Sequence, residues 1–219
     1  VVLGFIVAGT PSEQSCTPTW GTFDTLDGAA TRLDLDRRVA QVRGQGGSAI
    51  VSFGGQANKE LALTCEKQED LQKAYRDVIR RYGADTVDFD IEGTALANAE
   101  ANVRRAKAIR AIQSDIRSDG GRLAVWLTLP VTPQGLLPDA LAVIRSMVAA
   151  DVDVAGVNIM AMDFGVPEAG KDMLGAVKDA AEATQSQLGA LLGRGMSESE
   201  RWGRLGVTVM IGQNDIDAE

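Results

Sequence analysis

The chain has 219 residues, of which 45% are hydrophobic, and this is enough to build a buried core and argues against disorder. Its net charge of −8 disfavours nucleic acids and anionic membranes as partners, and no apolar run reaches the roughly 20 residues that span a bilayer. The chain has no histidine, which excludes Ser-His-Asp and Cys-His catalysis and His-ligated zinc, so acid–base chemistry must come mainly from carboxyl groups.

Apolar, β-branched runs alternate along the chain with stretches of helical periodicity. The runs predict six strands, at residues 1–8, 48–53, 86–91, 123–129, 152–160 and 205–211. Apolar stripes between them predict helices around residues 35–42, 71–79, 103–116, 141–148 and 174–191. This alternation predicts parallel strands with right-handed crossovers, either in an open doubly wound sheet or in an α/β barrel. A complete barrel needs eight strand–helix units, so six strands fit a barrel that is cut at both ends.

The third predicted strand carries a row of acids. Side chains alternate between the faces of a strand, so Asp88, Asp90 and Glu92 share one face while the residues between them are apolar. The apolar face is expected to pack on helices, which turns the acids into the barrel. Burial and like charge both raise the pKa of a carboxyl group, so the row is expected to share at least one proton near neutral pH. Glu92 is nearest the carboxyl end of the strand, where barrel enzymes carry out their chemistry.

Two other interpretations of the acidic row remain open on spacing alone. The carboxylates could bind magnesium or calcium, since oxygen ligands suit both ions. The row could also be the solvated face of an exposed edge strand. The irregular, Pro- and Gly-containing segment 9–26, which follows the first strand, is expected to form a loop on the active-site face.

At this point the sequence resembles a known family. Residues 85–92 fit D-x-x-D-x-D-x-E, the signature of glycoside hydrolase family 18, the chitinases and their relatives. The segment 52–55 fits the family motif S-x-G-G, and residues 157–164 resemble its Met-x-x-Asp segment. The three features occur in the family's order, cover nearly the whole chain, and look most similar to bacterial secreted chitinases.

The resemblance implies a TIM (β/α)8 barrel. The family places its acidic signature on barrel strand four and its Met-x-x-Asp segment on strand six, whereas here they fall on the third and fifth predicted strands. Each motif therefore falls one strand earlier in this chain than in the family. The chain is therefore expected to be a barrel truncated to about six strand–helix units, strands two to seven. Residues 1–219 are then a single catalytic barrel domain, incomplete at both ends.

The resemblance also implies a mechanism in which the substrate replaces the usual carboxylate nucleophile. The N-acetyl carbonyl group of the sugar attacks its own anomeric carbon, and water then opens the oxazolinium ion. Glu92 is the implied general acid and then the general base, Asp90 orients the acetamido group, and Asp88 holds Asp90. Neither a cofactor nor a metal is implied.

Six further residues are candidates for contact with the substrate, and five of them have a structural alternative. The resemblance implies that Met160 and Asp163 line the sugar pocket, while Gln213 follows the sixth predicted strand. The alternatives are core packing for Met160 and Phe5, a plain loop amide for Gln213, a packed rim anchor for Trp20, and relief of backbone crowding for Gly54.

The sequence departs from the family at one position of the sugar pocket. Many members carry a tyrosine in Met-x-Tyr-Asp, and its hydroxyl group helps to hold the acetamido group; this chain has Met162 there. The two tyrosines, Tyr75 and Tyr82, are predicted in or after the helix that precedes the acidic strand, where neither is placed to substitute.

The expected function is hydrolysis of β-1,4-linked N-acetylglucosamine polymers by a secreted, monomeric enzyme that binds chitin oligosaccharides. Cys16 and Cys65 are expected to form a disulfide if the protein is secreted, the alternative being two unpaired core residues. Three other functions remain: an endo-β-N-acetylglucosaminidase that acts on glycoproteins, a non-catalytic protein that binds chitin or N-acetylglucosamine, and a metal enzyme on a similar barrel.

Overall fold

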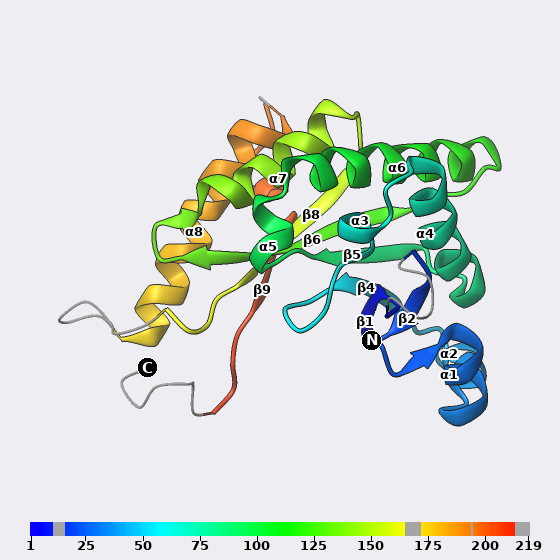
Figure 1. The fold of residues 1–219 in the computed structure, drawn as a ribbon. Helices are drawn as coiled ribbons and strands as arrows, with labels where there is room; N and C mark the ends of the chain where they lie inside the picture. Colours follow the sequence, from blue (N-terminus) through cyan, green and yellow to red (C-terminus); the bar gives the residue numbers. More distant parts are fainter. Residues whose placement is uncertain (11–15, 165–171, 194, 213–219) are drawn as a thin grey trace.

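A curved, mostly parallel sheet forms the centre of the molecule (Figure 1), whose computed structural model describes residues 1–10, 16–164, 172–193 and 195–212. All six predicted strands are present and lie in chain order across the sheet. They are β1 (Val2–Ala8), β4 (Ile50–Gly54), β5 (Thr86–Asp90), β6 (Ala124–Thr132), β8 (Val154–Met160) and β9 (Leu205–Thr208).

The long helices lie along one face of this sheet (Figure 1). Within the described residues β9 pairs only with β8, and β1 does not meet it, so the strands form an open arc rather than a closed barrel. The prediction of a partial α/β barrel is therefore confirmed. The helices are α1 (Leu26–Arg32), α2 (Leu35–Gly44), α3 (Leu61–Thr64), α4 (Gln68–Tyr82), α5 (Gly93–Ala97), α6 (Ala99–Ser118), α7 (Pro138–Ala149), α8 (Met173–Leu192) and α9 (Glu198–Trp202).

Three short antiparallel strands were not predicted. In the segment expected to be a loop, β2 (Pro18–Trp20) pairs with Ile6–Ala8 of β1, and β3 (Asp24–Thr25) pairs with β2. The third, β7 (Gly135–Leu136), turns back on the end of β6. Each has only two or three residues, which is too short for a period-two pattern to be recognised.

The hydrophobic core lies between the sheet and the helices. Its centre is an aromatic cluster in which Phe53 of β4 stacks on Phe89 of β5, with ring centroids 5.1 Å apart, and Tyr75 of α4 meets both rings edge-on. The apolar stripes that predicted the buried sides of the helices were only partly correct. Leu174, in the first turn of α8, is exposed, whereas Val177, Ala181, Leu188 and Leu191 of the same predicted stripe pack in or against the core.

A disulfide joins Cys16, just before β2, to Cys65 at the end of α3, with Cα atoms 4.8 Å apart. The predicted pairing is therefore confirmed. In the described part of the chain, no helix is long and apolar enough to cross a membrane.

Candidate active site

The row of acids lies on the inward face of a central strand. β5 is hydrogen-bonded to β4 on one side and to β6 on the other, and Asp88 and Asp90 are both buried. On the opposite face Val87 and Phe89 pack in the hydrophobic core. The interpretation as a solvated edge strand is therefore wrong, because β5 has a paired strand on each side and both Asp88 and Asp90 are buried.

Both carboxyl oxygens of Asp88 accept hydrogen bonds from neighbouring strands. The Ser52 hydroxyl group donates to Oδ2 at 2.6 Å, and the Thr128 hydroxyl group donates to Oδ1 at 2.7 Å. The amide of Asn158 on β8 donates to Thr128 Oγ1 at 3.1 Å, which leaves the single hydroxyl proton of Thr128 for Asp88. Two fixed donors favour the ionised form of Asp88.

The pKa values of Asp88 and Asp90 are raised mainly by burial. Burial raises the pKa of Asp88, and the hydroxyl groups of Ser52 and Thr128 oppose this effect. Burial also raises the pKa of Asp90, to about 8, with further contributions from the charge of Glu92, a hydrogen bond with Glu92 and the charge of Asp88. The row therefore keeps a proton near neutral pH at Asp90, as predicted.

Asp90 has one oxygen atom free for a ligand. Its buried Oδ1 has no hydrogen-bond partner among the described residues. A buried polar atom without a partner is costly, so such an atom needs an explanation. An N–H group of a bound substrate would supply the missing donor.

Glu92 lies two residues after the end of β5 and is half-buried. Its backbone carbonyl group accepts the N–H of Ala95 at 3.0 Å and so begins the short helix α5. The position of the Glu92 backbone is thus tied to that of α5.

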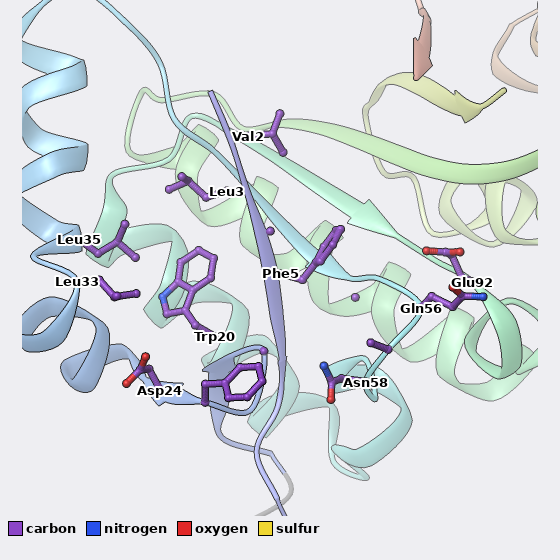
Figure 2. A pocket seen from close by; sticks show the side chains of 15 residues that line it. Val2, Leu3, Phe5, Trp20, Asp24, Leu33, Leu35, Gln56, Asn58 and Glu92 are labelled. Atoms are coloured by element: carbon purple, nitrogen blue, oxygen red, sulfur yellow. The ribbon is translucent and has the colours of Figure 1, made fainter. Parts of the chain in front are cut away.

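Glu92 lines a cavity of about 740 Å³ beside β1. β2 pairs only with the last three residues of β1, so the first half of β1 faces this space. Figure 2 shows Phe5 on the same side of β1 as Glu92, with Trp20 and Leu33 on the other side. Gln56 and Asn58, from the loop after β4, also line the cavity, so apolar surfaces and neutral amides lie there beside the carboxyl groups of Glu92 and Asp24.

Gly54 and Gly55 allow the ends of β4 and β5 to approach each other closely. Gly54 has φ +106°, and a Cβ atom at this position would lie 2.0 Å from the carbonyl oxygen of Asp90. The N–H of Gly55 donates to the same oxygen at 3.0 Å. These contacts favour the interpretation that Gly54 relieves crowding, although it also borders the cavity.

Trp20 has a structural contact as well as a place in the cavity wall. Its indole N–H donates to the hydroxyl group of Tyr82 at 2.9 Å, and the two rings meet edge-on. Met160 is half-buried at the end of β8, and Asp163 is exposed in the loop that follows. Neither is among the residues that line the cavity beside Glu92, and Gln213 lies outside the described residues.

Sequence reasoning missed Thr128, Asn158 and the two amides of the loop after β4. Thr128 occupies an inward position on a predicted strand, and this alternation was the signal that could have singled it out. Gln56 and Asn58 lie in a loop without periodicity, so no pattern indicated them. In the described part of the chain, no group of three or more His, Cys, Asp or Glu residues is placed to hold a metal ion.

The fold and the site together define part of an α/β barrel in which a row of coupled acids opens at the carboxyl end of a strand, where barrel enzymes place their active sites. Comparison with known proteins makes this class more specific. The chain is 34% identical over 224 residues to the probable bifunctional chitinase/lysozyme of Escherichia coli (strain K12), and the match covers 99% of the chain and 24% of that protein. It is also 34% identical over 189 residues to endochitinase 11 of Metarhizium anisopliae, with 83% and 36% covered.

A solved structure of a chitinase supports the same class. The catalytic domain of the hyperthermophilic chitinase from Pyrococcus furiosus superposes with a TM-score of 0.79 and 28% sequence identity, over 98% of this chain and 64% of that one. No family model matches the chain. The chain thus spans about a quarter to a third of the length of the two curated relatives. It has a chitinase-like catalytic fold and is homologous to glycoside hydrolases.

Proposed function

We propose that the protein hydrolyses β-1,4-linked N-acetylglucosamine polymers by the substrate-assisted, retaining mechanism, with Glu92 as general acid and base. The observation that carries the proposal is the pairing of Asp90, whose pKa is raised to about 8, with Glu92 at the wall of a cavity. A carboxyl pair that keeps a proton near neutral pH can protonate a leaving group.

In the proposed first step, Glu92 gives the shared proton to the glycosidic oxygen while the acetamido oxygen of the substrate attacks its own anomeric carbon. The free Oδ1 of Asp90 accepts the acetamido N–H and so orients this attack. As the proton leaves, the pair of Asp90 and Glu92 becomes more negative, which stabilises the positive charge of the oxazolinium ion. Glu92 then takes a proton from the water molecule that opens this ion.

Asp88 has a supporting role in this proposal. It is fixed by Ser52 and Thr128, so its negative charge stays close to Asp90 throughout the reaction. That charge favours the protonated form of Asp90 before the substrate binds.

A neutral sugar chain suits the cavity wall. Phe5 and Trp20 offer ring faces on which pyranose rings can pack, and the amides of Gln56 and Asn58 can bond to hydroxyl groups. Active domain 2 of the Pyrococcus furiosus chitinase has been crystallised with chito-oligosaccharides, which supports this substrate class. Met160, Asp163 and Gln213 remain proposed contacts of the sugar.

We further propose that the protein is a secreted monomer and that residues 1–219 belong to a single catalytic domain. The disulfide between Cys16 and Cys65 supports an oxidising compartment, because such bonds persist outside the cytosol. The similarity to an endochitinase supports the proposed substrate.

A second candidate function is binding of chitin without catalysis, and the identity of Met162 favours it. The two tyrosine hydroxyl groups of the chain are engaged elsewhere, since that of Tyr75 donates to Glu60 and that of Tyr82 accepts from Trp20. The hydroxyl group expected at the acetamido position therefore has no substitute from these side chains.

The test is hydrolysis of a fluorogenic chitobioside by the full-length protein that carries this chain, beside its Glu92→Gln variant and with a chelator present. We expect turnover by the wild-type protein and a loss of about 100-fold or more in the variant, because glutamine cannot donate the proton. If neither protein turns over but both bind chitin oligomers, the binding function replaces the catalytic one. Loss of turnover on adding chelator would indicate a metal enzyme.

A further inference from the structure

A buried ion pair lies on the far side of the strands that carry the site. Glu60 is 1% exposed and Arg105 of α6 is 0% exposed, and Nη2 of Arg105 lies 2.7 Å from Oε2 of Glu60. Burying two charges costs as much free energy as their attraction returns, so such a pair is weak evidence for stability alone. The other contacts of Glu60 and Arg105 indicate a second role for the pair.

Glu60 connects the pair to the strands and to the loop beside the cavity. Its carboxyl group accepts the N–H of Ala62 at 2.8 Å and the hydroxyl group of Tyr75, whose ring packs against Phe53 and Phe89. Glu60 also ends the loop 55–60, whose amides line the cavity. The carboxyl group therefore fixes one wall of the site from behind.

Arg105 connects the pair to the segment that follows Glu92. Its Nη1 donates to Oδ1 of Asn102 at 2.5 Å, and Nδ2 of Asn102 donates to the carbonyl oxygen of Leu96 at 3.0 Å. Leu96 belongs to α5, the short helix that begins at the carbonyl group of Glu92. An unbroken series of side-chain bonds thus runs from the loop 55–60 to the helix behind Glu92.

We infer that Glu60, Arg105 and Asn102 form a positioning network that fixes α5 against the loop 55–60 and so holds the Glu92 carboxyl group at the wall of the cavity. The effect on turnover rests on the proposed function of Glu92, whereas the effect on α5 does not. A five-residue helix is too short to be stable by itself, so its position must come from such tertiary bonds. A displacement of about 1 Å at a catalytic group can cost about 100-fold in rate.

The chain supplies a matched control on the same helix. Asn102 and Gln113 both belong to α6, are both 3% exposed, and both donate to backbone carbonyl groups. Gln113 bonds to Leu123 and Asp153, which precede β6 and β8 at the opposite end of the sheet. The variants Asn102→Ala and Gln113→Ala therefore remove similar bonds at the two ends of one helix.

We expect Asn102→Ala in the full-length protein to lower kcat by about 10- to 100-fold with KM within about threefold, because Glu92 is displaced while the sugar contacts remain. Hydrogen exchange should become faster at the amides of Ala95 and Leu96, which bond to Glu92. Gln113→Ala should leave both kcat and these amides as in the wild-type protein. Asn102→Asp keeps the acceptor for Arg105 but removes the amide donor to Leu96, so it should show the same loss even if the alanine variant does not fold.

Two results would separate the inference from the proposed function. If Asn102→Ala and Asn102→Asp keep wild-type kcat and wild-type exchange at α5, or lose no more than Gln113→Ala, the positioning role is overturned. If the wild-type protein turns over no chitin substrate but α5 still exchanges faster only in the Asn102 variants, the network stands and the proposed function fails.

Discussion

Two groups of buried carboxyl groups lie on opposite faces of β4 and β5, and they are stabilised in different ways. On the outward face Glu60 meets the guanidinium group of Arg105 at 2.7 Å. On the inward face no cation meets Asp88 among the described residues: its carboxyl group accepts from the neutral hydroxyl groups of Ser52 and Thr128 and from the backbone of Phe89, and the pKa of Asp90 is raised to about 8. The first arrangement fixes a charge in place, and the second keeps a proton available.

This difference shows which of the two clusters is suited to acid–base catalysis. A carboxylate that is paired with a cation and bonded at both oxygens has no proton to give and no free atom for a ligand. The inward row has both a proton to give and a free atom for a ligand, since Asp90 is protonated near neutral pH and its Oδ1 has no partner in the described part of the chain. Position alone would not have separated the two clusters, because both are buried beside the same strands.

The largest effect on stability is expected at the outward cluster. Arg105→Leu leaves Glu60 buried without its cation, which should lower the free energy of unfolding by about 3–5 kcal/mol. The double variant Glu60→Gln/Arg105→Leu removes both charges. The one amide oxygen of glutamine can accept the N–H of Ala62 while its NH2 group donates to the hydroxyl oxygen of Tyr75, so the variant should recover at least about half of the loss. Urea denaturation measures both values, and a double variant as unstable as the single one would show that charge compensation is not the role of the pair.

A smaller effect of opposite sign is expected at the inward row. The pKa of Asp90 is about 8 in the folded protein, above its ordinary value of 3.8, so between about pH 4 and 8 the folded state holds a proton that the unfolded state releases. The stability of the wild-type protein should therefore fall as the pH rises through this window. Asp90→Asn lacks this dependence and should gain roughly 2–4 kcal/mol relative to the wild-type protein between pH 4 and 8. A constant difference in urea denaturation across that range would contradict the raised pKa.

The same comparison shows how far the sequence can predict the structure. Alternation on β5 predicts which face holds Asp88 and Asp90, because the period of a strand is a local property. The partners of both clusters are not local. Thr128 lies 40 residues from Asp88, and Arg105 lies 45 residues from Glu60, so each contact depends on which strands and helices become neighbours.

Elements with weak local patterns were missed for a related reason. β2 is held by its pairing with β1 and by the bond from Trp20 to Tyr82, which is 62 residues away. On α8 the predicted stripe lies on the core side at Val177, Ala181 and Leu188, but Leu174, in the first turn of the helix, is exposed. A sequence pattern predicts an element well where burial follows hydrophobicity, and less well at the end of an element or where a distant partner decides.

The central claim, that Asp90 and Glu92 share the catalytic proton, is tested most directly by the pH dependence of kcat/KM for a fluorogenic chitobioside. This parameter reports the ionisation of the free enzyme. We predict that kcat/KM falls above about pH 8, where Asp90 loses its proton, and that this alkaline limit moves in the residual activity of Asp90→Asn. A profile that stays level well beyond pH 8, or one whose alkaline limit is the same in both proteins, would contradict the claim.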